Sequence, residues 1–481
     1  MQKPFYLTTT LPYVNAEPHI GFALEIVQAD AIARYRALMG DEVFFNTGTD
    51  EHGLKIFRKA EEEGKDPQAY VDHFAARFKE LREKLDLFPG LTFIRTTDAK
   101  HKAAAQEFWR RCLANGDIYK KDYEVKYCVG CELEKTDSEL ENGRCPIHPN
   151  LEIEIIREEN YFFRWSKYQK PLEDFYAARP DFVVPDFRFN EIKAFVARGL
   201  EDFSISRLKE KMPWGIPVPD DENQVMYVWF DALINYISTV DWPQDRARFE
   251  RFWGTQEAPN GIQVAGKDQV RQQAAMWQAM LLSAGLPTSK QIIIHGFITV
   301  NGQKMSKSLG NVVHPFSLVE EYGTDAVRYF LLRHIHPFED SDFTMERFKE
   351  AYNAGLANGL GNLASRIMTL AEKHLPGPIE IPAPAEFPEE YTRPFEAYNY
   401  NGAMEYVWKR IQELDQRIEK EEPFKLIKTD EAAGKKLIAE LATELYWIAR
   451  MLNPFMPATN AKLKEAIRAN RKPENLFPRK D

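Results

Sequence analysis

The segment PFYLTTTLPYVNAEPHIGFALEIVQADAIARYRALMGDEVFFNTG, residues 4–48, decides the fold of the chain. Residues 4–11 have the composition of a strand, residues 12–21 form a loop, and residues 22–40 have the period of an amphipathic helix that ends at Gly40. The apolar run EVFFNTG, residues 42–48, follows as a second strand. Strand, helix and strand at this spacing make a βαβ unit, which predicts a parallel sheet with covering helices. Because ligands bind at the carboxyl ends of parallel strands, the loops PYVNAEPH and TGTDEHG are the expected site.

The bulk composition is that of a globular protein. A chain of 481 residues is too long for one hydrophobic core, and about 150 residues per domain suggests three domains. No stretch approaches the roughly 18 apolar residues that cross a bilayer, and residues 1–14 do not have the pattern of a secretion signal, so we expect no membrane partner and a cytoplasmic location. The net charge of −10 argues against non-specific coating of nucleic acid, but it permits a local basic patch.

The order of patterns along the chain indicates an interrupted α/β domain followed by helices. The βαβ rhythm stops near residue 115, and residues 119–214 hold short β-like runs and several prolines, which we interpret as an insertion. The rhythm resumes with MYVWFDALINYI, IQVAGKD and QIIIHGFITVNG. From about Met345 the pattern is helical, with one break between Pro376 and Pro388.

Two short segments carry the strongest chemical signal. PHIGF, residues 18–22, begins the first long helix, where unpaired backbone N–H groups and the positive end of the helix dipole should attract phosphate. His19 can donate to a phosphate oxygen there, and Gly21 permits close approach of a nucleotide. KMSKS, residues 304–308, puts Lys304 and Lys307 on a short loop able to close over a triphosphate.

In this order, on two halves of one α/β domain, the two segments resemble the HIGH and KMSKS signatures of class I aminoacyl-tRNA synthetases. Further segments make the resemblance specific to one member of this class, the methionyl-tRNA synthetase family, from residue 5 to about 370. The segments that look like this family are TTTLPYVNAEPHIG, FFNTGTDEHG, PWGIPVP, YVWFDALINYI, AGKD and GQKMSKSLGNVV. The resemblance implies activation of methionine with ATP and Mg²⁺, followed by transfer of the aminoacyl group to the terminal ribose of tRNA(Met).

The resemblance also implies an architecture. It is a Rossmann-like α/β catalytic domain with a parallel sheet, an inserted connective domain with a zinc knuckle, and a C-terminal α-helical anticodon-binding bundle. The boundaries we expect are 1–115 and 215–312 for the two catalytic halves, 116–214 for the insertion, 313–348 for a stem-contact linker and 349–481 for the helical domain.

Site roles follow from the same resemblance, residue by residue. His19 and Gly21 would contact ATP, Asp268 in AGKD would bind the ribose hydroxyls, and Lys304 and Lys307 would stabilise charge on the phosphates during catalysis. Asp50 would pair with the α-ammonium of methionine. The rest of the amino-acid pocket would comprise Leu11, Tyr13, Trp229, Ala232, Leu233, Tyr236, Gln269 and Gln273. Aromatic edges suit a thioether sulfur, although Trp229 and Tyr236 would otherwise be interpreted as ordinary core.

The cysteines indicate a metal site. Cys128, Cys131, Cys145 and His148 follow the pattern C-x2-C-x13-C-x2-H, in which each pair can ligate from one tight turn. Three thiolates and one imidazole would make a closed tetrahedral site for structural Zn²⁺. Cys112 stands apart in an expected helix and is interpreted as a buried structural thiol.

The helical region offers candidate contacts to tRNA. Asn362 and Arg366 share one helix face, and the resemblance implies that they help to read the anticodon; without it, a polar surface pair is the preferred interpretation. The family's stacking tryptophan is Phe424 here, which can still stack on a base. A basic stretch, comprising Lys462, Lys464, Arg468, Arg471, Lys472, Arg479 and Lys480, fits either a tRNA-facing surface or a solvated helix and tail.

Three positions depart from the family pattern. The second histidine of HIGH is Phe22, and losing one preorganised donor typically lowers a rate by about a hundred- to a thousand-fold. We therefore predict that another donor compensates and that Phe22→His raises the adenylation rate only modestly. Gln269 and Gln273 stand where the family usually has isoleucine and histidine, and if buried they should be hydrogen-bonded.

Other functions share part of the pattern. Leucyl, isoleucyl and valyl synthetases carry both signatures, but residues 116–214 are too few for their editing domain. Small nucleotidylyltransferases need neither a helical tRNA-reading domain nor a zinc knuckle. A degenerate paralogue that binds tRNA without charging it is suggested by Phe22 but disfavoured by the lysines, Asp50 and Trp229. With no further module apparent after Asp481, we expect a monomer.

Overall fold

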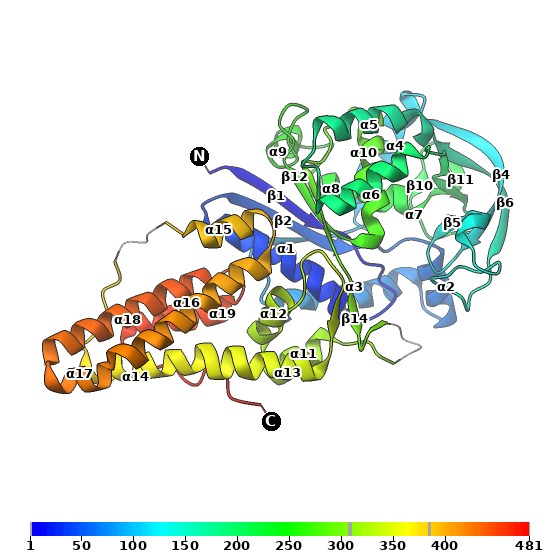
Figure 1. Ribbon diagram of the computed structural model, residues 1–481. Coiled ribbons are helices and arrows are strands. Elements are labelled where there is room, and N and C mark those ends of the chain that lie inside the picture. Colours follow the sequence, from blue (N-terminus) through cyan, green and yellow to red (C-terminus); the bar gives the residue numbers. More distant parts are fainter. Residues whose placement is uncertain (1, 306–309, 383–385, 481) are drawn as a thin grey trace. The chain divides into compact units, whose positions relative to one another are not determined.

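The computed structural model of the chain describes residues 2–305, 310–382 and 386–480 (Figure 1). These residues form two compact units, each assembled from separate stretches of sequence. Unit 1 comprises Met1–Pro18, Asp41–Glu80 and Pro89–Ile294, and unit 2 comprises His19–Gly40, Leu81–Phe88 and His295–Asp481.

Unit 1 is built on a six-stranded sheet with the order β3-β2-β1-β12-β13-β7. The pairs β1–β2, β1–β12, β2–β3 and β13–β7 are all parallel, which confirms the parallel sheet predicted from residues 4–48. The strands are β1 (Pro4–Thr9), β2 (Glu42–Thr49), β3 (Leu91–Arg95), β7 (Val183–Val184), β12 (Gly261–Gly266) and β13 (Gln291–His295). Strand β7 falls within the predicted insertion, yet it pairs with β13 in the main sheet.

Gly48 permits the close pairing of β2 with β3. A Cβ at this position would lie 1.8 Å from the backbone carbonyl oxygen of Ile94, a distance that no side chain can tolerate. Gly48, the first glycine of the TGTDEHG segment, is therefore required because two strands approach each other closely, directly before the loop that carries Asp50.

Unit 1 contains two further, separate sheets. A four-stranded sheet, with the order β5-β4-β6-β8, contains the long antiparallel pair β4 and β6, drawn in cyan and teal in Figure 1. Its strands are β4 (Ile118–Cys128), β5 (Leu133–Lys135), β6 (Glu154–Phe163) and β8 (Phe203–Ser204). A three-stranded sheet comprises β10 (Pro217–Val218), β11 (Asp221–Met226) and β9 (Ser206–Leu208).

The helices of unit 1 contribute large apolar side chains to its core. They are α2 (Leu54–Glu62), α4 (Ala99–Ala114), α5 (Gln169–Ala178), α6 (Asp186–Ala197), α7 (Val228–Ala232), α8 (Asn235–Ser238), α9 (Arg246–Phe252) and α10 (Trp277–Ser283), while α3 (Pro67–Lys84) runs from unit 1 into unit 2. Cys112 of α4 is fully buried, as predicted, and burial raises the pKa of its thiol to about 12.

Unit 2 is mainly helical, which confirms the pattern predicted from Met345 onward. Its helices are α1 (Ile20–Leu38), α11 (Pro315–Tyr322), α12 (Thr324–Arg333), α13 (Met345–Ala351), α14 (Asn362–His374), α15 (Glu389–Glu396), α16 (Tyr400–Glu421), α17 (Pro423–Thr429), α18 (Glu431–Met451) and α19 (Pro457–Ala469). A π-helical stretch, Tyr352–Gly361, joins α13 to α14. A small sheet contains β14 (Ile298–Val300), β15 (Gln303–Lys304) and β16 (Ser341–Phe343).

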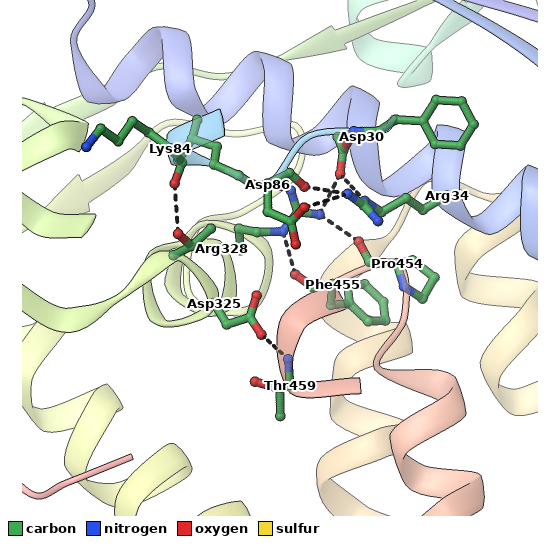
Figure 2. A network of polar contacts seen from close by, with 12 residues as sticks. Asp30, Arg34, Lys84, Asp86, Asp325, Arg328, Pro454, Phe455 and Thr459 are labelled. Atoms are coloured by element: carbon green, nitrogen blue, oxygen red, sulfur yellow. Dashed lines mark hydrogen bonds and ion pairs between the residues drawn. The ribbon is translucent and has the colours of Figure 1, made fainter. Parts of the chain in front are cut away.

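A buried ion cluster joins three distant parts of unit 2 (Figure 2). The fully buried guanidinium of Arg328, on α12, donates to Asp30 Oδ2 of α1 at 2.6 Å. It also donates to the carbonyl oxygens of Leu85 at 3.1 Å, Pro454 at 2.9 Å and Phe455 at 2.8 Å. One side chain thus fixes α1, the 81–88 segment and the turn between α18 and α19 to α12.

None of the helices in the described part of the chain has a stretch that could cross a lipid bilayer.

Candidate functional site

The carboxyl ends of β1 and β2 lie next to each other in unit 1, where the sequence predicted the site. Beyond the strands, Tyr13 pairs with Asp50 in parallel register, the Asp50 N–H donates to the Pro12 carbonyl at 2.9 Å, and the Val14 N–H donates to the Asp50 carbonyl at 3.3 Å. This extension of the β1–β2 ladder holds the side chains of Tyr13 and Asp50 beside each other.

Three buried polar atoms at this position have no hydrogen-bond partner among the described residues. They are Asp50 Oδ1, the Tyr13 hydroxyl and Trp229 Nε1, and the rings of Tyr13 and Trp229 meet edge to face with centroids 6.3 Å apart. Asp50 is 3% exposed, and burial, followed by the charge of Asp231, raises the pKa of its carboxyl well above the usual range. Because unsatisfied buried groups are rare and unfavourable, this set indicates a place that a polar ligand completes.

The aliphatic and aromatic side chains predicted for the amino-acid pocket also lie in unit 1. Helix α7 carries Trp229 and Ala232, and Leu233 and Tyr236 follow them; all four are buried. The Tyr236 carbonyl accepts from the Tyr6 hydroxyl at 2.7 Å, which ties this region to β1. Leu11 is half-buried at the end of β1.

A buried His–Asp–His cluster, which was not predicted from the sequence, lies close to Asp50. His52 Nδ1 lies 2.6 Å from Asp231 Oδ2, and His101 Nε2 lies 2.8 Å from Asp231 Oδ1. Burial alone would raise the pKa of Asp231, but the charges and hydrogen bonds of the two histidines lower it. Asp231 therefore stays ionised and contributes to the raised pKa of Asp50.

The segment after β12 carries three more predicted residues. Asp268 is exposed in a 3₁₀ turn, Lys267–Gln269, and Gln269 is half-buried. Gln273 is buried and, as predicted, hydrogen-bonded: its Oε1 accepts from Gln263 Nε2 at 2.6 Å and its carbonyl accepts from Gln278 Nε2 at 2.8 Å.

The start of α1, in unit 2, differs from the sequence prediction in one respect. The Ile20 N–H donates to the Val313 carbonyl at 2.9 Å, the Gly21 N–H donates to His19 Nδ1 at 3.1 Å, and the N–H groups of Phe22 and Ala23 donate to the His19 carbonyl. The expectation of unpaired N–H groups here is therefore wrong, because the carbonyl of Val313, in the irregular segment before α11, and the His19 cap accept their hydrogen bonds. The positive end of the helix dipole still lies at this position, so this part of the prediction is unaffected.

The His19 imidazole is held in a defined state. Burial, followed by the charge of His314, lowers the pKa of His19 to about 4, so the ring is neutral at pH 7. Since Nδ1 accepts the Gly21 N–H, the proton lies on Nε2, which is the available donor.

Met305 of the KMSKS segment and Val313, which follows it, both lie near the start of α1. Met305 Cε would lie 3.6 Å from a Cβ on Gly21, and Val313 on the other side accepts from Ile20 at 2.9 Å. Lys304 is exposed on β15 with its Nζ 5.8 Å from the centroid of the Phe297 ring. Lys307 lies outside the described residues. The sequence predicted that His19 and the loop with Lys304 and Lys307 converge on one nucleotide; within unit 2, Met305 and Val313 lie near the start of α1, and the convergence on a nucleotide stays a prediction.

Cys128, Cys131, Cys145 and His148 come together as predicted. Their ligand atoms all lie within 4.8 Å of one another. Cys131 Sγ is 3.5 Å from Cys145 Sγ and 3.2 Å from His148 Nδ1, and Cys128 Sγ is 3.8 Å from His148 Nδ1. Ligands of a tetrahedral zinc ion lie about 3.3–3.8 Å apart, so the four residues fit that ion. A Cβ on Gly130 would lie 2.5 Å from His148 Cγ, so the knuckle turn needs a glycine.

The predicted anticodon residues lie in unit 2. Asn362 is exposed and lines a groove of about 510 Å³ together with Ser365, Lys472, Arg479 and other residues of the carboxyl-terminal tail. Arg366, one turn further along α14, forms an ion pair with Asp415 of α16. Phe424 is 43% exposed on α17, a high value for a large apolar side chain.

Comparison with known proteins agrees with this geometry. The sequence model of the family described as "tRNA synthetases class I (M)" matches residues 5–154 and 131–368. A methionine–tRNA ligase from Thermosynechococcus vestitus is 47% identical over 395 residues, 81% of this chain and 73% of that protein. One from Nostoc sp. is 41% identical over 97% of this chain and 90% of its own length. The solved structure of Mycobacterium tuberculosis methionyl-tRNA synthetase in complex with methionyl-adenylate superposes with a TM-score of 0.89 at 35% identity, covering 99% of this chain and 100% of that one. The chain therefore belongs to the methionyl-tRNA synthetase family of class I aminoacyl-tRNA synthetases, and the reaction it catalyses is the ATP-dependent ligation of methionine to tRNA.

Proposed function

We propose that Asp50, Tyr13 and Trp229 recognise the polar end of methionine during its activation. The Asp50 carboxylate accepts hydrogen bonds from the α-ammonium, which favours the ionised form that burial otherwise disfavours. The hydroxyl of Tyr13 and Nε1 of Trp229 are the remaining buried groups that need partners. The observation that carries this assignment is the presence of three orphaned polar atoms at one strand end. Leu11, Ala232, Leu233 and Tyr236 then line the side-chain pocket, with Gln269 and Gln273 beside it.

The His52–Asp231–His101 cluster sets the electrostatics of this pocket. An ionised, fully buried Asp231 makes the surroundings of Asp50 more negative, which strengthens attraction for an ammonium group. His52 and His101 hold Asp231 in place by contacts of 2.6 and 2.8 Å.

We assign ATP binding to five residues, each on the basis of the family resemblance. Nε2–H of the neutral His19 ring donates to a phosphate oxygen, Gly21 leaves room for the nucleotide, and Asp268 binds the ribose hydroxyls. Lys304 and Lys307 stabilise the charge that develops on the phosphates as the methionine carboxylate attacks the α-phosphorus. Mg²⁺, when bound with ATP, neutralises phosphate charge. Such a transfer needs position and charge rather than a side-chain nucleophile.

We assign the Cys128, Cys131, Cys145 and His148 cluster to one structural Zn²⁺. All four tetrahedral positions would be taken by protein atoms, which leaves no open position for catalysis. The ion would fix the knuckle at the end of β4.

Recognition of tRNA(Met) is assigned to unit 2. The groove lined by Asn362, Lys472 and Arg479 combines an amide that can read a base edge with two cations that can contact phosphates. The exposed ring of Phe424 is available for base stacking. We propose that the enzyme works as a monomer in the cytoplasm, where its three substrates occur together.

One experiment tests the assignment of Asp50 directly. We would measure ATP–pyrophosphate exchange with methionine and with its α-hydroxy analogue, which lacks the ammonium group, and also with leucine, isoleucine and valine. The natural protein should prefer methionine over the hydroxy analogue by at least a hundred-fold, and Asp50→Asn should reduce that preference to less than tenfold. Glu17→Gln, a half-exposed carboxylate that pairs with Arg77, serves as the matched control. An Asp50→Asn variant that keeps the full preference would refute the assignment, and stimulation by leucine alone would refute the choice of methionine.

A further inference from the structure

Helices α18 and α19 of unit 2, together with the 379–382 segment, enclose a second groove of about 420 Å³. It shares no lining residue with the groove that contains Asn362. Its three cationic and two aromatic lining residues are Arg450, Lys464, Arg468, Tyr446 and Trp447. The other lining residues belong to the 379–382 segment and are apolar, and among the residues that the structure describes no Asp or Glu lines the groove. The groove therefore combines positive charge with apolar surface.

Aromatic side chains hold the cations of this groove in place. Arg468 Nη2 donates to the Tyr446 hydroxyl at 2.6 Å, and the guanidinium carbon of Arg468 lies 5.3 Å from the centroid of the same ring. Lys464 Nζ lies 5.5 Å from that centroid. The guanidinium carbon of Arg450 lies 5.9 Å from the centroid of the Trp447 ring. Because Tyr446 is only 5% exposed, its ring is a fixed support for the two cations of α19.

Other cations of unit 2 are neutralised by carboxylates instead. Arg410 and Arg417 of α16 both pair with Glu444, at 3.2 and 2.8 Å. Within the described part of the chain, neither Lys464 nor Arg468 forms an ion pair with a carboxylate. In a protein with a net charge of −10, these two side chains therefore leave local positive charge that no acidic partner compensates.

The chemistry of the groove fits a nucleotide of RNA. Arginine and lysine bind phosphate oxygens, and a cation that already rests on a rigid ring loses less freedom when it binds. The half-buried ring of Trp447 offers a flat apolar surface on which a ribose or a base can pack. An acidic peptide would match the charge, but its carboxylates bring no flat group for Trp447. The observations therefore favour a phosphodiester ligand over an acidic protein segment.

We propose that this groove is a second contact site for tRNA(Met), separate from the anticodon groove. Lys464 and Arg468 bind phosphate oxygens of the tRNA backbone, and Trp447 packs against an adjacent ribose or base. The inference rests on the proposed recognition of tRNA by unit 2. Because phosphate contacts carry no sequence information, this site increases affinity for the body of the tRNA and leaves the choice of anticodon to the other groove.

The test measures the Kd of the full chain for a tRNA(Met) transcript over a range of salt concentrations. In the double variant Lys464→Gln and Arg468→Gln, we expect the Kd to rise at least about fivefold, and the slope of log Kd against log salt to fall by about two, one for each lost phosphate contact. Tyr446→Phe removes the hydroxyl that holds Arg468 but no charge, so the Kd should rise while the slope stays that of the natural protein. Lys435→Gln, which removes an exposed cation of α18 that pairs with Glu431, is the matched control and should change neither quantity.

A second tRNA with an altered anticodon separates this proposal from that of the anticodon groove. The double variant should weaken binding of both tRNAs by the same factor, whereas Asn362→Ala should weaken binding of tRNA(Met) more. If Asn362→Ala weakened both equally, the proposed anticodon groove would be refuted and the second site would stand.

Three results would overturn the second site. The first is a double variant whose Kd and salt slope for tRNA equal those of the natural protein. The second is a raised Kd with an unchanged slope, because that pattern reports a structural effect and no lost phosphate contact. The third is a double variant that loses affinity for poly-glutamate or for inorganic phosphate but keeps its Kd for tRNA, since the groove would then serve another anion.

Discussion

Replacing Arg328 with methionine should loosen the helical unit more than any change at an exposed position. Methionine is of similar length, so the change leaves little cavity, but it removes the donors to Asp30 and to the carbonyls of Leu85, Pro454 and Phe455. Removing one partner of a buried ion pair typically costs about 3–5 kcal/mol, and each buried carbonyl left without a donor adds to this. Arg34 still pairs with Asp30 at 2.8 Å, so we expect the loss to lie in this range and not above it.

Amide hydrogen exchange, followed by mass spectrometry, resolves this loss within unit 2. A loss of about 3–5 kcal/mol corresponds to exchange that is about 10²- to 10⁴-fold faster in α1 and α12. Arg328→Lys keeps the charge but has fewer donors in a different geometry, so it should fall between the natural protein and Arg328→Met. Lys435→Met breaks only the exposed pair with Glu431 and should change exchange by less than about threefold. If exchange in α1 and α12 rises less than fivefold in Arg328→Met, the cluster does not stabilise unit 2 in the way described.

Three further outcomes follow from the structure. Burial raises the pKa of Asp50, so the ionised form of this carboxyl destabilises the methionine-free protein increasingly as the pH rises. Asp50→Asn should therefore raise the melting temperature by about 1–4 °C at pH 8 and by less at pH 5. An equal gain at both pH values would contradict this. Cys145→Ser should abolish binding of about one equivalent of zinc, as measured by metal analysis after dialysis, while retention of a full equivalent would show that the cluster is not the site. Gly48→Ala forces a methyl group to within 1.8 Å of the Ile94 carbonyl and should lower the melting temperature sharply, whereas Gly359→Ala, whose nearest contact is 3.2 Å, should not.

The sequence predicted those features that are encoded locally. Residues 4–48 have the periodicity of a strand, a helix and a strand, and the structure contains β1, α1 and β2 there. The metal cluster was predictable because two short spacings bring each ligand pair into one turn. The role of Asp50 was predicted from the resemblance and stays a prediction, whereas the place of its loop at a strand end was predicted from the βαβ pattern and agrees with the pairing of Tyr13 with Asp50.

Features that depend on long-range contacts were not predictable. His52 and Asp231 are 179 residues apart, and no periodicity relates them. The hydrogen bond from the Ile20 N–H to the Val313 carbonyl was not predictable either. The helical pattern of residues 20–38 does not show which distant backbone group will contact the first turn of that helix. The role of Arg328 was also hidden, since a lone arginine in an amphipathic pattern is normally assigned to the surface.

The ion cluster of unit 2 has a consequence for the order in which the chain acquires structure during synthesis. Asp30 precedes Arg328 by 298 residues, and Arg328 precedes Phe455 by 127. At roughly 5–20 residues per second, a ribosome needs about 15–60 s to deliver Arg328 after Asp30 and about 6–25 s more to deliver Phe455. During that interval the nascent α1 helix, with Asp30 on its buried face, has none of these partners. Unit 2 can therefore acquire this complete ion cluster only after residue 455 has been synthesised, long after its earliest helix.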